Sequence, residues 1–485
     1  MFFKSFAFRI YLVALVLRVI PVLLSHGLGI GLDDMFQYDM LARSLAAGNG
    51  FRWYAQPDLN LIAPYVKFDL STVDYDPVRG VPTSFRAPLY PSFLALVYFL
   101  FGTGSTRFFA ARLAQAILLG APLAPLTYWV SKRLFPPSLA GDGPGERSAR
   151  ISAWVIACYP MLLVYPLGLG TENPFFVLLL ASFLFLLLSL QQPTTSRLLL
   201  AGFLLGLTAL TRSVILPFAV AAFCLLFYVH RKRALLFILA LAITITPWIV
   251  RNSLLHHKLT GIETSMGYNL YLGYHPQGNG SFVFGPSLDL LTILDDAQRD
   301  RVGTEKAIGF IKAQPQRFIP LAIHRLGFFF GLEKRVLMYF YSNNLLGHVP
   351  LPGLLSISAV LLLPFIFVSL SAALGLVHLR NTPEHILLVL LFIGYLLPHV
   401  LILSEDRFHL ALLPYLAILA AELWVNGFAP FKRRWHDSQA GKVLVMIAIL
   451  CAFCLVANWG FELNRDADKI AQLLGPNGNQ TYFPY

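Results

Sequence analysis

Charged side chains are scarce in this sequence. Of its 485 residues only 13% are Asp, Glu, Lys or Arg, while 57% are hydrophobic. Soluble domains carry roughly 25% charged residues. Apolar runs of about 18 residues or more recur along the chain, and each could cross a bilayer as a helix. The composition therefore excludes an ordinary soluble protein and indicates a polytopic membrane protein.

Patterns that bind nucleotides or nucleic acids are also missing. Lys and Arg number 37 against 25 Asp and Glu, which gives a net charge of +12. No basic run with interleaved aromatic residues suggests nucleic acid. We attribute the positive excess to loops that stay on one side of a membrane. Neither a P-loop nor a G-x-G-x-x-G motif occurs in the sequence, so nothing in it indicates ATP or a nucleotide-sugar.

Cysteine is rare, and all of it lies in apolar runs: Cys158, Cys224, Cys451 and Cys454. The last two form a C-x-x-C, but inside a hydrophobic run without flanking His or acidic residues. We interpret the four as lipid-facing or helix-facing side chains rather than a redox or metal site. The N-terminal apolar segment lacks a small-residue cleavage site, so we read it as a retained first helix.

The apolar runs predict an all-α polytopic protein with about eleven transmembrane helices, interfacial helices and extracytoplasmic loops. A further apolar segment, 87–102, is short and rich in proline and aromatic residues, and we expect it to lie at the interface. The predicted spans are 6–25, 107–130, 150–169, 173–190, 197–211, 213–229, 234–250, 354–377, 384–403, 408–427 and 442–460.

The positive-inside rule supports a non-crossing segment 87–102. Only then do the basic clusters fall together on the cytoplasmic side: Lys132/Arg133, Arg147/Arg150, Arg231–Arg233, Arg380 and Lys432–Arg434. The large loops and the tail then face outward, with nearly all carboxylates. We divide the chain into a catalytic module 1–260 that includes the first loop 26–106, an extracytoplasmic loop or small domain 251–353, C-terminal helices 354–460 and an extracytoplasmic tail 461–485.

Two adjacent carboxylates, Asp33 and Asp34, follow the first span in "GIGLDDMFQYDMLARSLAAGNGF". The helical segment after them ends at Gly48 and carries apolar residues at helical spacing, which predicts a helix along the membrane surface. Acidic residues suit a helix N-terminus, so the pair could simply cap this helix. One Asp can cap while its neighbour faces a cavity.

Further charges mark the outward ends of other spans: Arg86 in "VPTSFRAPLYP", Glu172 in "GTENP", Arg212 in "LTRSV", and Glu405, Asp406, Arg407 and His409 in "SEDRFHLALLP". An isolated charge at an interface usually marks only a helix end. Here the charges converge on one face. Carboxylates together with several arginines suit a site that activates a hydroxyl and binds a phosphate.

In order and spacing these motifs resemble the bacterial multi-spanning glycosyltransferases of the GT-C fold, within them the protein O-mannosyltransferase and aminoarabinose-transferase relatives. The resemblance covers most of 1–260 and the hairpin near 405. It implies a sugar donor linked to polyprenyl phosphate, transfer to a lipid, glycan or protein acceptor, contact with membrane lipids and no nucleic acid. It also implies a multi-pass protein of the bacterial inner membrane whose active site faces the periplasm or exterior.

The same resemblance implies residue roles. Asp33 matches the catalytic base, with Asp34 or Glu172 orienting the acceptor, and Arg407 is expected near the donor phosphate, with Arg86 and Arg212. Two positions depart from the family: Ala87 replaces a proline after Arg86, and Ser213 replaces the proline of an Arg-Pro pair. We expect the sugars of donor or acceptor to contact the remaining candidates, Tyr38, Tyr90, Glu405 and His409.

No cofactor is predicted, and a divalent metal is not favoured. "DYD" at Asp74–Asp76 imitates a metal-binding D-x-D, but a lipid monophosphate offers no pyrophosphate for such a clamp. His256, His257 and His275 read as loop residues. The main alternative function is a polyprenyl-lipid flippase or transporter, which predicts inverted repeats and charges at mid-membrane. We find no internal repeat, and the polar residues cluster at one face instead.

Overall fold

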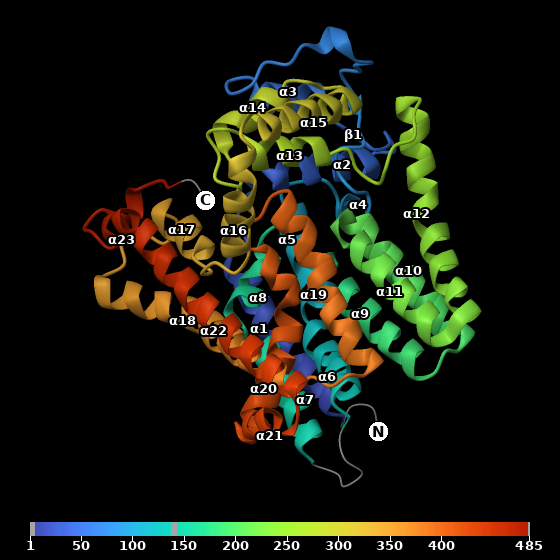
Figure 1. Ribbon diagram of the computed structural model, residues 1–485. Helices are drawn as coiled ribbons and strands as arrows, with labels where there is room; N and C mark the ends of the chain where they lie inside the picture. The colour runs from blue at the N-terminus through green and yellow to red at the C-terminus, as the bar shows by residue number, and fades with distance from the viewer. Residues whose placement is uncertain (1–4, 137–142, 484–485) are drawn as a thin grey trace.

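The fold is almost entirely helical (Figure 1). The computed structural model describes residues 5–136 and 143–483, and within them the strands are limited to β1 (Arg52–Trp53) and β2 (Val81–Pro82). These pair antiparallel, with Arg52 opposite Pro82 and Trp53 opposite Val81. The all-α prediction is confirmed. It has a physical basis, since backbone groups in hydrocarbon must be hydrogen-bonded within each helix.

Long apolar helices form the body of the molecule. They are α1 (Phe6–Leu24), α5 (Arg107–Ala114) continued by the π-helical turn η3 (Gln115–Gly120) and α6 (Leu123–Leu134), α7 (Pro144–Cys158) with α8 (Pro160–Val164), α9 (Glu172–Gln191), α10 (Thr195–Thr211), α11 (Leu216–His230), α12 (Leu235–His256), α18 (Leu351–Gly375), α19 (Pro383–Leu401), α20 (Leu413–Asn426) and α22 (Gln439–Arg465).

Every predicted span coincides with helix, but fewer helices meet a strict length criterion. Among the described residues eight helices are long and apolar enough to cross a membrane, or nine if a pair bent by 51° at Tyr159 counts as one span. The difference from eleven has two further causes. Helix α10 has only 17 residues, and α11 and α12 are counted as one continuous stretch although the short turn η6 (Arg231–Ala234) separates them.

Shorter helices gather mainly at one end (Figure 1). They are α2 (Asp34–Ala46), α3 (Gln56–Ile62), α4 (Leu89–Phe101), α13 (Met266–Tyr274), α14 (Phe284–Leu291), α15 (Asp296–Ala313), α16 (Phe318–Phe329) and α17 (Arg335–Ser342), with α23 (Ala467–Leu473) near the C-terminus. At the opposite end lie α21 (Ala429–Asp437) and the N-terminus (Figure 1). We call the first end the outer end, after its predicted orientation.

Two of these short helices test the sequence analysis directly. Helix α4 has 13 residues, about 20 Å at 1.5 Å per residue, which is shorter than a hydrocarbon core of about 30 Å. It therefore fits the predicted interfacial segment. Helix α2 begins and ends near the predicted points, but its apolar face packs on protein: Tyr38 and Leu41 are buried, and Tyr38 contacts Tyr90 of α4.

The segment 251–353, expected to be a loop or small domain, forms a layer of several helices. Helices α13, α14 and α15 pack together over the first outer loop (Figure 1). The aromatic and basic stretch 314–341 is divided into α16 and α17 around residues 331–334. Helix α16 packs against α19, which ties this layer to the membrane helices.

Helices α9 and α20 form the centre, with 78% and 89% of their spans buried, whereas α1 and α22 lie at the periphery with 22% and 17%. Close approach depends on small residues. A Cβ at Gly202 of α10 would come within 2.1 Å of the Phe237 carbonyl oxygen of α12, so only glycine allows these two helices to touch.

Buried arginines complete helix ends inside the body. Arg18 of α1 is fully buried and donates to the carbonyl oxygens of Ile156 and Ala157, at the end of α7, at 2.9 and 3.1 Å. Arg325 likewise donates to the Leu401 carbonyl at the end of α19, at 3.0 Å. The last carbonyls of a helix have no intrahelical donor, and a cation also complements the helix dipole there. These arginines are structural.

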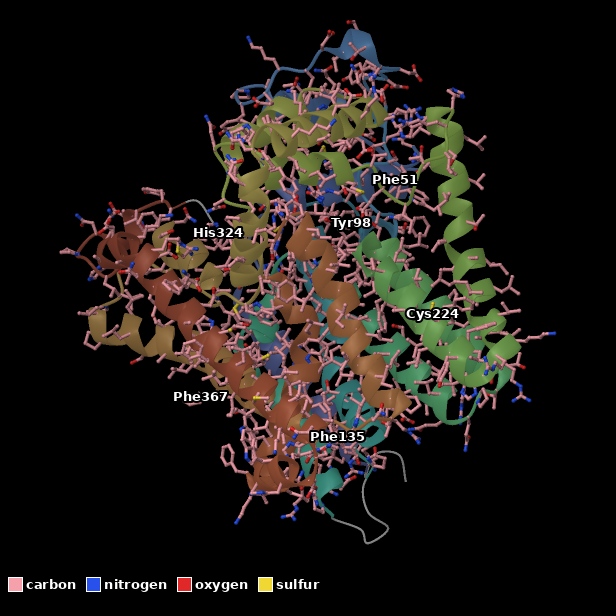
Figure 2. The ribbon with its side chains drawn as sticks, in the orientation of Figure 1. Phe51, Tyr98, Phe135, Cys224, His324 and Phe367 are labelled. Carbon is pink, nitrogen blue, oxygen red and sulfur yellow. The ribbon has the colours of Figure 1, made fainter. Side chains whose placement is uncertain are left out.

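The flanks of the body are apolar. Figure 2 shows Cys224 on α11 and Phe367 on α18, and Phe367 is 61% exposed. All four cysteines are free, and Cys158, Cys224 and Cys454 are exposed on helix surfaces. Large apolar side chains exposed along whole helices are what a lipid-facing surface requires.

Candidate functional site

Charged side chains from several distant segments meet at the outer end of the bundle. We call this set the arginine–carboxylate network: Asp34, Arg86, Glu172, Arg212, Arg335, Glu405 and Arg407. All but Arg335 were singled out from sequence. The predicted convergence of these charges on one place is therefore visible in the structure.

Arg407 lies at the centre of the network. Its Nε is 2.9 Å from Glu405 Oε2 and 3.6 Å from Glu172 Oε1, and its Nη2 is 3.6 Å from Asp34 Oδ2. Within the described residues, the buried Nε makes no hydrogen bond of normal geometry. Arg212 differs, because its Nη1 donates to Glu172 Oε1 at 2.9 Å. Arg407 thus has three carboxylates around it and donor capacity left over.

Arg86 binds the acidic side of the network. Its Nη2 pairs with Asp34, and its Nε donates to Gln37 Oε1 at 2.9 Å. The guanidinium also lies over the Tyr38 ring, 5.3 Å from the centroid, which adds a cation–π contact. Asp34, Gln37 and Tyr38, all on α2, therefore fix the orientation of Arg86.

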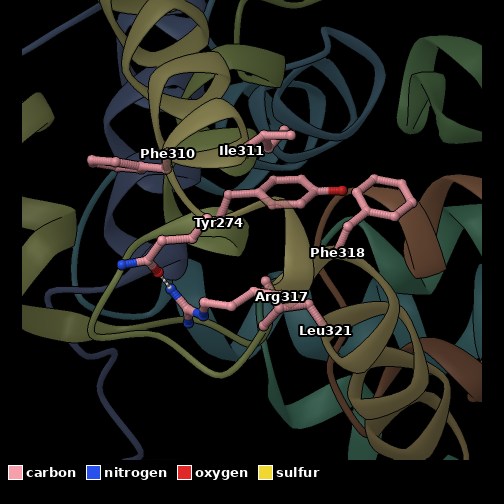
Figure 3. A pocket seen from close by; sticks show the side chains of 7 residues that line it. Tyr274, Phe310, Ile311, Arg317, Phe318 and Leu321 are labelled. Atoms are coloured by element: carbon pink, nitrogen blue, oxygen red, sulfur yellow. Dashed lines mark hydrogen bonds between the residues drawn. The ribbon is translucent and has the colours of Figure 1, made fainter.

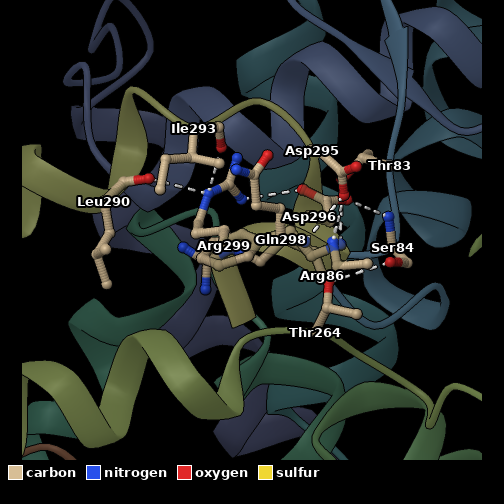
Figure 4. Close-up of polar contacts among 12 residues, drawn as sticks. Thr83, Ser84, Arg86, Thr264, Leu290, Ile293, Asp295, Asp296, Gln298 and Arg299 are labelled. Atoms are coloured by element: carbon tan, nitrogen blue, oxygen red, sulfur yellow. Dashed lines mark hydrogen bonds and ion pairs between the residues drawn. The ribbon is translucent and has the colours of Figure 1, made fainter. Parts of the chain in front are cut away.

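The segment before Arg86 is held by a buried aspartate on α15 (Figure 4). Asp296 Oδ2 accepts from Thr83 Oγ1 at 2.6 Å and from the Ser84 backbone N–H at 2.7 Å. Its Oδ1 pairs with Arg299 at 2.9 Å. A carboxylate this buried persists only when both oxygens are paired. The layer 251–353 therefore helps to place Arg86.

Local sequence explains the positions of Glu172 and Arg212. Glu172 begins α9 two residues after Gly170, where a Cβ would come within 2.7 Å of Glu172 Oε2. Arg212 is the extended residue that ends α10. Ser213 donates through its Oγ and backbone N–H to Glu263 Oε1 at 2.5 and 3.2 Å. These two contacts fix the chain beside Arg212 without a proline.

Of the two adjacent acids, Asp33 caps the helix and Asp34 faces the charged site, which are the two roles considered from sequence. Asp33 is exposed and caps α2, accepting from the Met35 N–H at 2.8 Å, whereas Asp34 joins the network. Partial desolvation and the Asp34 charge raise the pKa of Asp33. Burial would raise the pKa of Asp34 as well, but Arg86 and Arg407 outweigh it and hold that pKa below its usual value.

The predicted sugar contacts fare unevenly. Glu405 belongs to the network, but Tyr38, Tyr90 and His409 are 4%, 0% and 0% exposed. Tyr90 donates to Gln115 in the π-helical turn at 2.6 Å, and His409 bonds to Glu333 at 3.0 Å. Their surfaces are occupied by protein, so in this structure they support the network from beneath.

Sequence reasoning missed Arg335 and Glu333. Arg335, the first residue of α17, donates to Glu405 Oε2 at 3.0 Å. Both residues lie in the aromatic and basic stretch 314–341. The "GLEKR" that interrupts its apolar residues was the available signal of a break.

A second charge cluster on α2, also missed, is fully satisfied. Asp39, 1% exposed, accepts from Tyr98, from Arg43 and twice from Arg107, at 2.8–3.1 Å. Arg43 continues to Asp58 at 2.7 Å. We call Asp39, Arg43, Asp58, Tyr98 and Arg107 the Asp39 cluster. Every oxygen of Asp39 is used, so its role is structural.

The candidate metal ligands have ordinary partners. Asp76 Oδ1 accepts from the backbone N–H groups of Val78 and Arg79 at 2.8 and 3.0 Å, as in a turn, and His256 Nε2 lies 2.6 Å from Ser84 Oγ. His275 Nδ1 accepts from the Gln277 N–H at 3.3 Å. In residues 5–136 and 143–483, no group of three or more His, Cys, Asp or Glu could hold a metal ion.

A cavity in the outer layer is too small for a substrate (Figure 3). It measures about 10 Å³ and lies among Tyr274, Arg317 and Phe318, with Arg317 bonded to Gln314 at 3.0 Å. A single water needs about 10–15 Å³. The network, rather than this cavity, is the candidate site.

Comparison with known protein families finds no match, and comparison with characterised protein sequences finds none either. Among solved structures, the chain is similar to ArnT from Cupriavidus metallidurans bound to undecaprenyl phosphate, with 15% identity, a TM-score of 0.37, and coverage of 88% of this chain and 79% of that one. The apo form of the same protein shows 14% identity and a TM-score of 0.36, with coverage of 87% of this chain and 79% of that one. ArnT is a GT-C aminoarabinose transferase, the class that the sequence motifs resemble. A TM-score this low carries no conclusion about activity.

Proposed function

We propose that this protein is an integral-membrane glycosyltransferase of the GT-C type. It transfers a sugar from a polyprenyl-phosphate donor to a hydroxyl or amine of a lipid, glycan or protein acceptor, on the extracytoplasmic face of the bacterial inner membrane. The observation that carries the proposal is the arginine–carboxylate network, which joins the family-like motifs of α2, the Arg86 segment, α9, α10 and the 405–407 hairpin.

The placement of the network supports a lipid donor. It lies where apolar helices end, so a polyprenyl chain in the bilayer can bring its phosphate to the arginines. Arg407 is the best placed to receive a phosphate oxygen, because its side chain is 26% exposed and its Nη2 lies 3.6 Å from Asp34, beyond hydrogen-bond distance. Guanidinium groups bind phosphate bidentately and stabilise the charge that develops on a leaving phosphate.

Asp33 is the better candidate for the general base. Its pKa is raised, and one of its oxygens caps α2, which orients the other. Asp34 is bound by Arg86 and Arg407 and has a lowered pKa, so it is a weak base. Asp34 acts instead with Glu172 to orient the arginines and the acceptor.

The reaction is a single displacement at the anomeric carbon. The acceptor oxygen or nitrogen forms the new bond to that carbon while Asp33 takes its proton. The bond from the carbon to the phosphate oxygen breaks, and polyprenyl phosphate leaves with its electron pair, next to Arg407. Attack opposite the leaving group inverts the configuration. A monophosphate leaving group needs no metal clamp, so the step uses side chains alone.

Charge distribution supports the outward orientation. The basic clusters on α21 and η6 lie at the end opposite the network (Figure 1). Positive loops are retained in the cytoplasm, which supports a network that faces outward. There a lipid-linked sugar is available as a donor, whereas nucleotide-sugars are not.

The test uses the purified protein in liposomes with a radiolabelled polyprenyl-phosphate sugar and envelope extract as the source of acceptor. A glycosyltransferase moves label to the acceptor and releases polyprenyl phosphate, and chelator leaves the rate unchanged. A flippase moves the labelled lipid between leaflets and leaves the sugar attached. Leaflet exchange without sugar release would refute the proposal.

A further inference from the structure

The outer end of α22 runs along the segment that links α16 to α17. Asn458 and Trp459 donate to the carbonyl oxygens of Gly327 and Phe330 at 3.0 and 2.8 Å. One turn later, Glu462 Oε2 accepts from the Leu332 N–H at 2.9 Å. Successive turns of one helix thus hold successive residues of this segment, which we call the 327–335 link.

Lys334 completes this contact with an ion pair. Its Nζ lies 2.6 Å from Glu462 Oε1 and also pairs with Asp466, the residue that ends α22. The lysine is only 18% exposed, and Glu462 only 9%. A half-buried cation between two carboxylates is a fixed point of the chain, unlike an exposed surface pair.

Glu333, the neighbour of Lys334, extends into the core instead. Its Oε1 accepts from Tyr159 at 2.8 Å and lies 3.0 Å from His409 Nε2. His409 Nδ1 in turn contacts the Phe329 carbonyl at 2.8 Å. Because His409 follows Arg407 by two residues, this contact joins the 327–335 link to the hairpin that carries Arg407.

Arg335, the next residue, enters the network. It donates to Glu405 at 3.0 Å, and Glu405 pairs with Arg407 at 2.9 Å. Three consecutive side chains therefore reach three different places: the core beneath the hairpin, the end of α22, and the network.

The C-terminal tail packs against the rest of α17. Leu337 and Tyr341 share a buried apolar cluster with Leu354 and with Leu473 of α23. The Tyr482 N–H also donates to the Ser342 carbonyl at 3.1 Å. The helix that begins with Arg335 is thus held at both ends by residues from the last part of the chain.

From these contacts we infer that Lys334 is a positioning residue: with the outer end of α22 it sets Arg335, and through Glu405 also Arg407, in the geometry that binds the donor phosphate. This inference rests on the proposed function. It assigns to the C-terminal helix and tail, which contribute no residue to the network, a part in donor recognition.

The test compares Lys334→Met with Lys334→Arg in the full-length protein. Losing the anchor leaves Arg335 and Arg407 present but poorly oriented, so Lys334→Met should raise the KM for the polyprenyl-phosphate sugar about 10-fold, the effect of one misplaced charged hydrogen bond. The kcat should fall by less than the KM rises, because the base is untouched and Arg407 is still present beside the leaving phosphate. Arginine keeps the charge and reach, and Lys334→Arg should restore most of the affinity.

The route of the effect is tested in an Arg335→Ala background. If Lys334 acts through Arg335, Lys334→Met adds little to the KM of the Arg335→Ala protein, which is the non-additivity expected of coupled residues. Full additivity of the two substitutions would overturn the inference, and so would a fall in kcat with unchanged KM.

Lys132→Met is the matched control. Lys132 forms a comparable ion pair with Glu146 at 2.9 Å, at the opposite end of the bundle. Lys132→Met should leave the KM for the donor unchanged. An equal rise of the KM in Lys132→Met and Lys334→Met would contradict a specific role for Lys334. Binding of polyprenyl phosphate alone distinguishes a failure of the proposed function from a failure of the inference about Lys334. If wild type does not bind it, the proposed function fails; if wild type and Lys334→Met bind equally, only the inference fails.

Discussion

Helix α2 carries two aspartates with opposite environments. Asp34 and Asp39 are five positions apart, about 140° around the helix axis, so they face different surroundings. The Asp39 side chain is 1% exposed, and its oxygens receive four hydrogen bonds. The Asp34 side chain is 41% exposed; it pairs with Arg86, and its second oxygen lies 3.6 Å from Arg407.

The difference separates structural charge from functional charge. A buried carboxylate whose oxygens are all hydrogen-bonded cannot bind a substrate, and removing it leaves its cationic partners buried without a counter-charge. A half-exposed carboxylate with one loose partner can exchange that partner for a ligand. The arginines follow the same division, because Arg107 is fully engaged by Asp39 and Arg407 is not.

The largest effect is expected at Asp33. Replacing Asp33 with Asn removes the base, so kcat should fall by about 10²–10⁴, while the protein stays folded because Asn also caps helices. The measurement is sugar transfer in liposomes. Asp69 provides the control, since it is likewise an exposed aspartate that caps a short helix, accepting from Ser71 N–H at 3.0 Å. Asp69→Asn should be fully active, and near-normal turnover in Asp33→Asn would remove Asp33 from the role.

The next effect concerns the phosphate. Arg407→Ala should lower kcat/KM for the donor by about 10²–10³, the range seen when one group that stabilises transition-state charge is lost. Steady-state kinetics with varied donor measure it. Arg43→Ala offers the contrast, because Arg43 also pairs with two carboxylates but in the Asp39 cluster. A similar loss in catalysis from both would erase the distinction between the two regions.

A change in stability is expected at Asp39. Asp39→Asn leaves Arg43 and Arg107 without their buried partner, which should lower the free energy of unfolding by about 3–5 kcal/mol. Asp34→Asn should change the free energy of unfolding less, since the Asp34 side chain is half-exposed and less tightly paired. Unfolding in detergent, followed by tryptophan fluorescence, compares the two. Equal destabilisation would mean that Asp34 is as structural as Asp39.

The smallest effect is a shift in pH dependence. Asp33 works as a base only when ionised, so transfer falls as the pH drops through its pKa, which is raised above the usual value of about 3.9. The Asp34 charge is one cause of that rise. Asp34→Asn should therefore move the acidic limb of the kcat profile to lower pH. A limb that stays in place would show that another group controls it.

Much of the network could be predicted because charge is so rare in this chain. In a sequence that is 57% hydrophobic, Glu172, Arg212 and Arg407 stand out at the ends of apolar runs. Ends of membrane helices on one side must meet in space, so the spans alone bring these residues near each other. That reasoning needs only the period and length of the helices.

The rest depends on side-chain direction, which periodicity does not give. Tyr38 and Tyr90 were expected to contact sugar, yet they pack edge to face on each other, 5.1 Å between ring centroids. Arg335 was missed because its segment is aromatic and basic, and the break at "GLEKR", against which α22 packs, was not recognised. The Asp39 cluster was missed because Arg107 belongs to a different segment, and no local pattern links it to Asp39.

Arg18 has a consequence for how the chain is assembled. Alone in a bilayer, a helix with an arginine near its middle is penalised by up to about 3 kcal/mol at insertion. Besides the Ala14 carbonyl of its own helix, this guanidinium binds the carbonyl oxygens of Ile156 and Ala157, 138 and 139 positions downstream. Arg18 therefore gains these two partners only after α7 has been synthesised, so α1 must first enter the membrane without them.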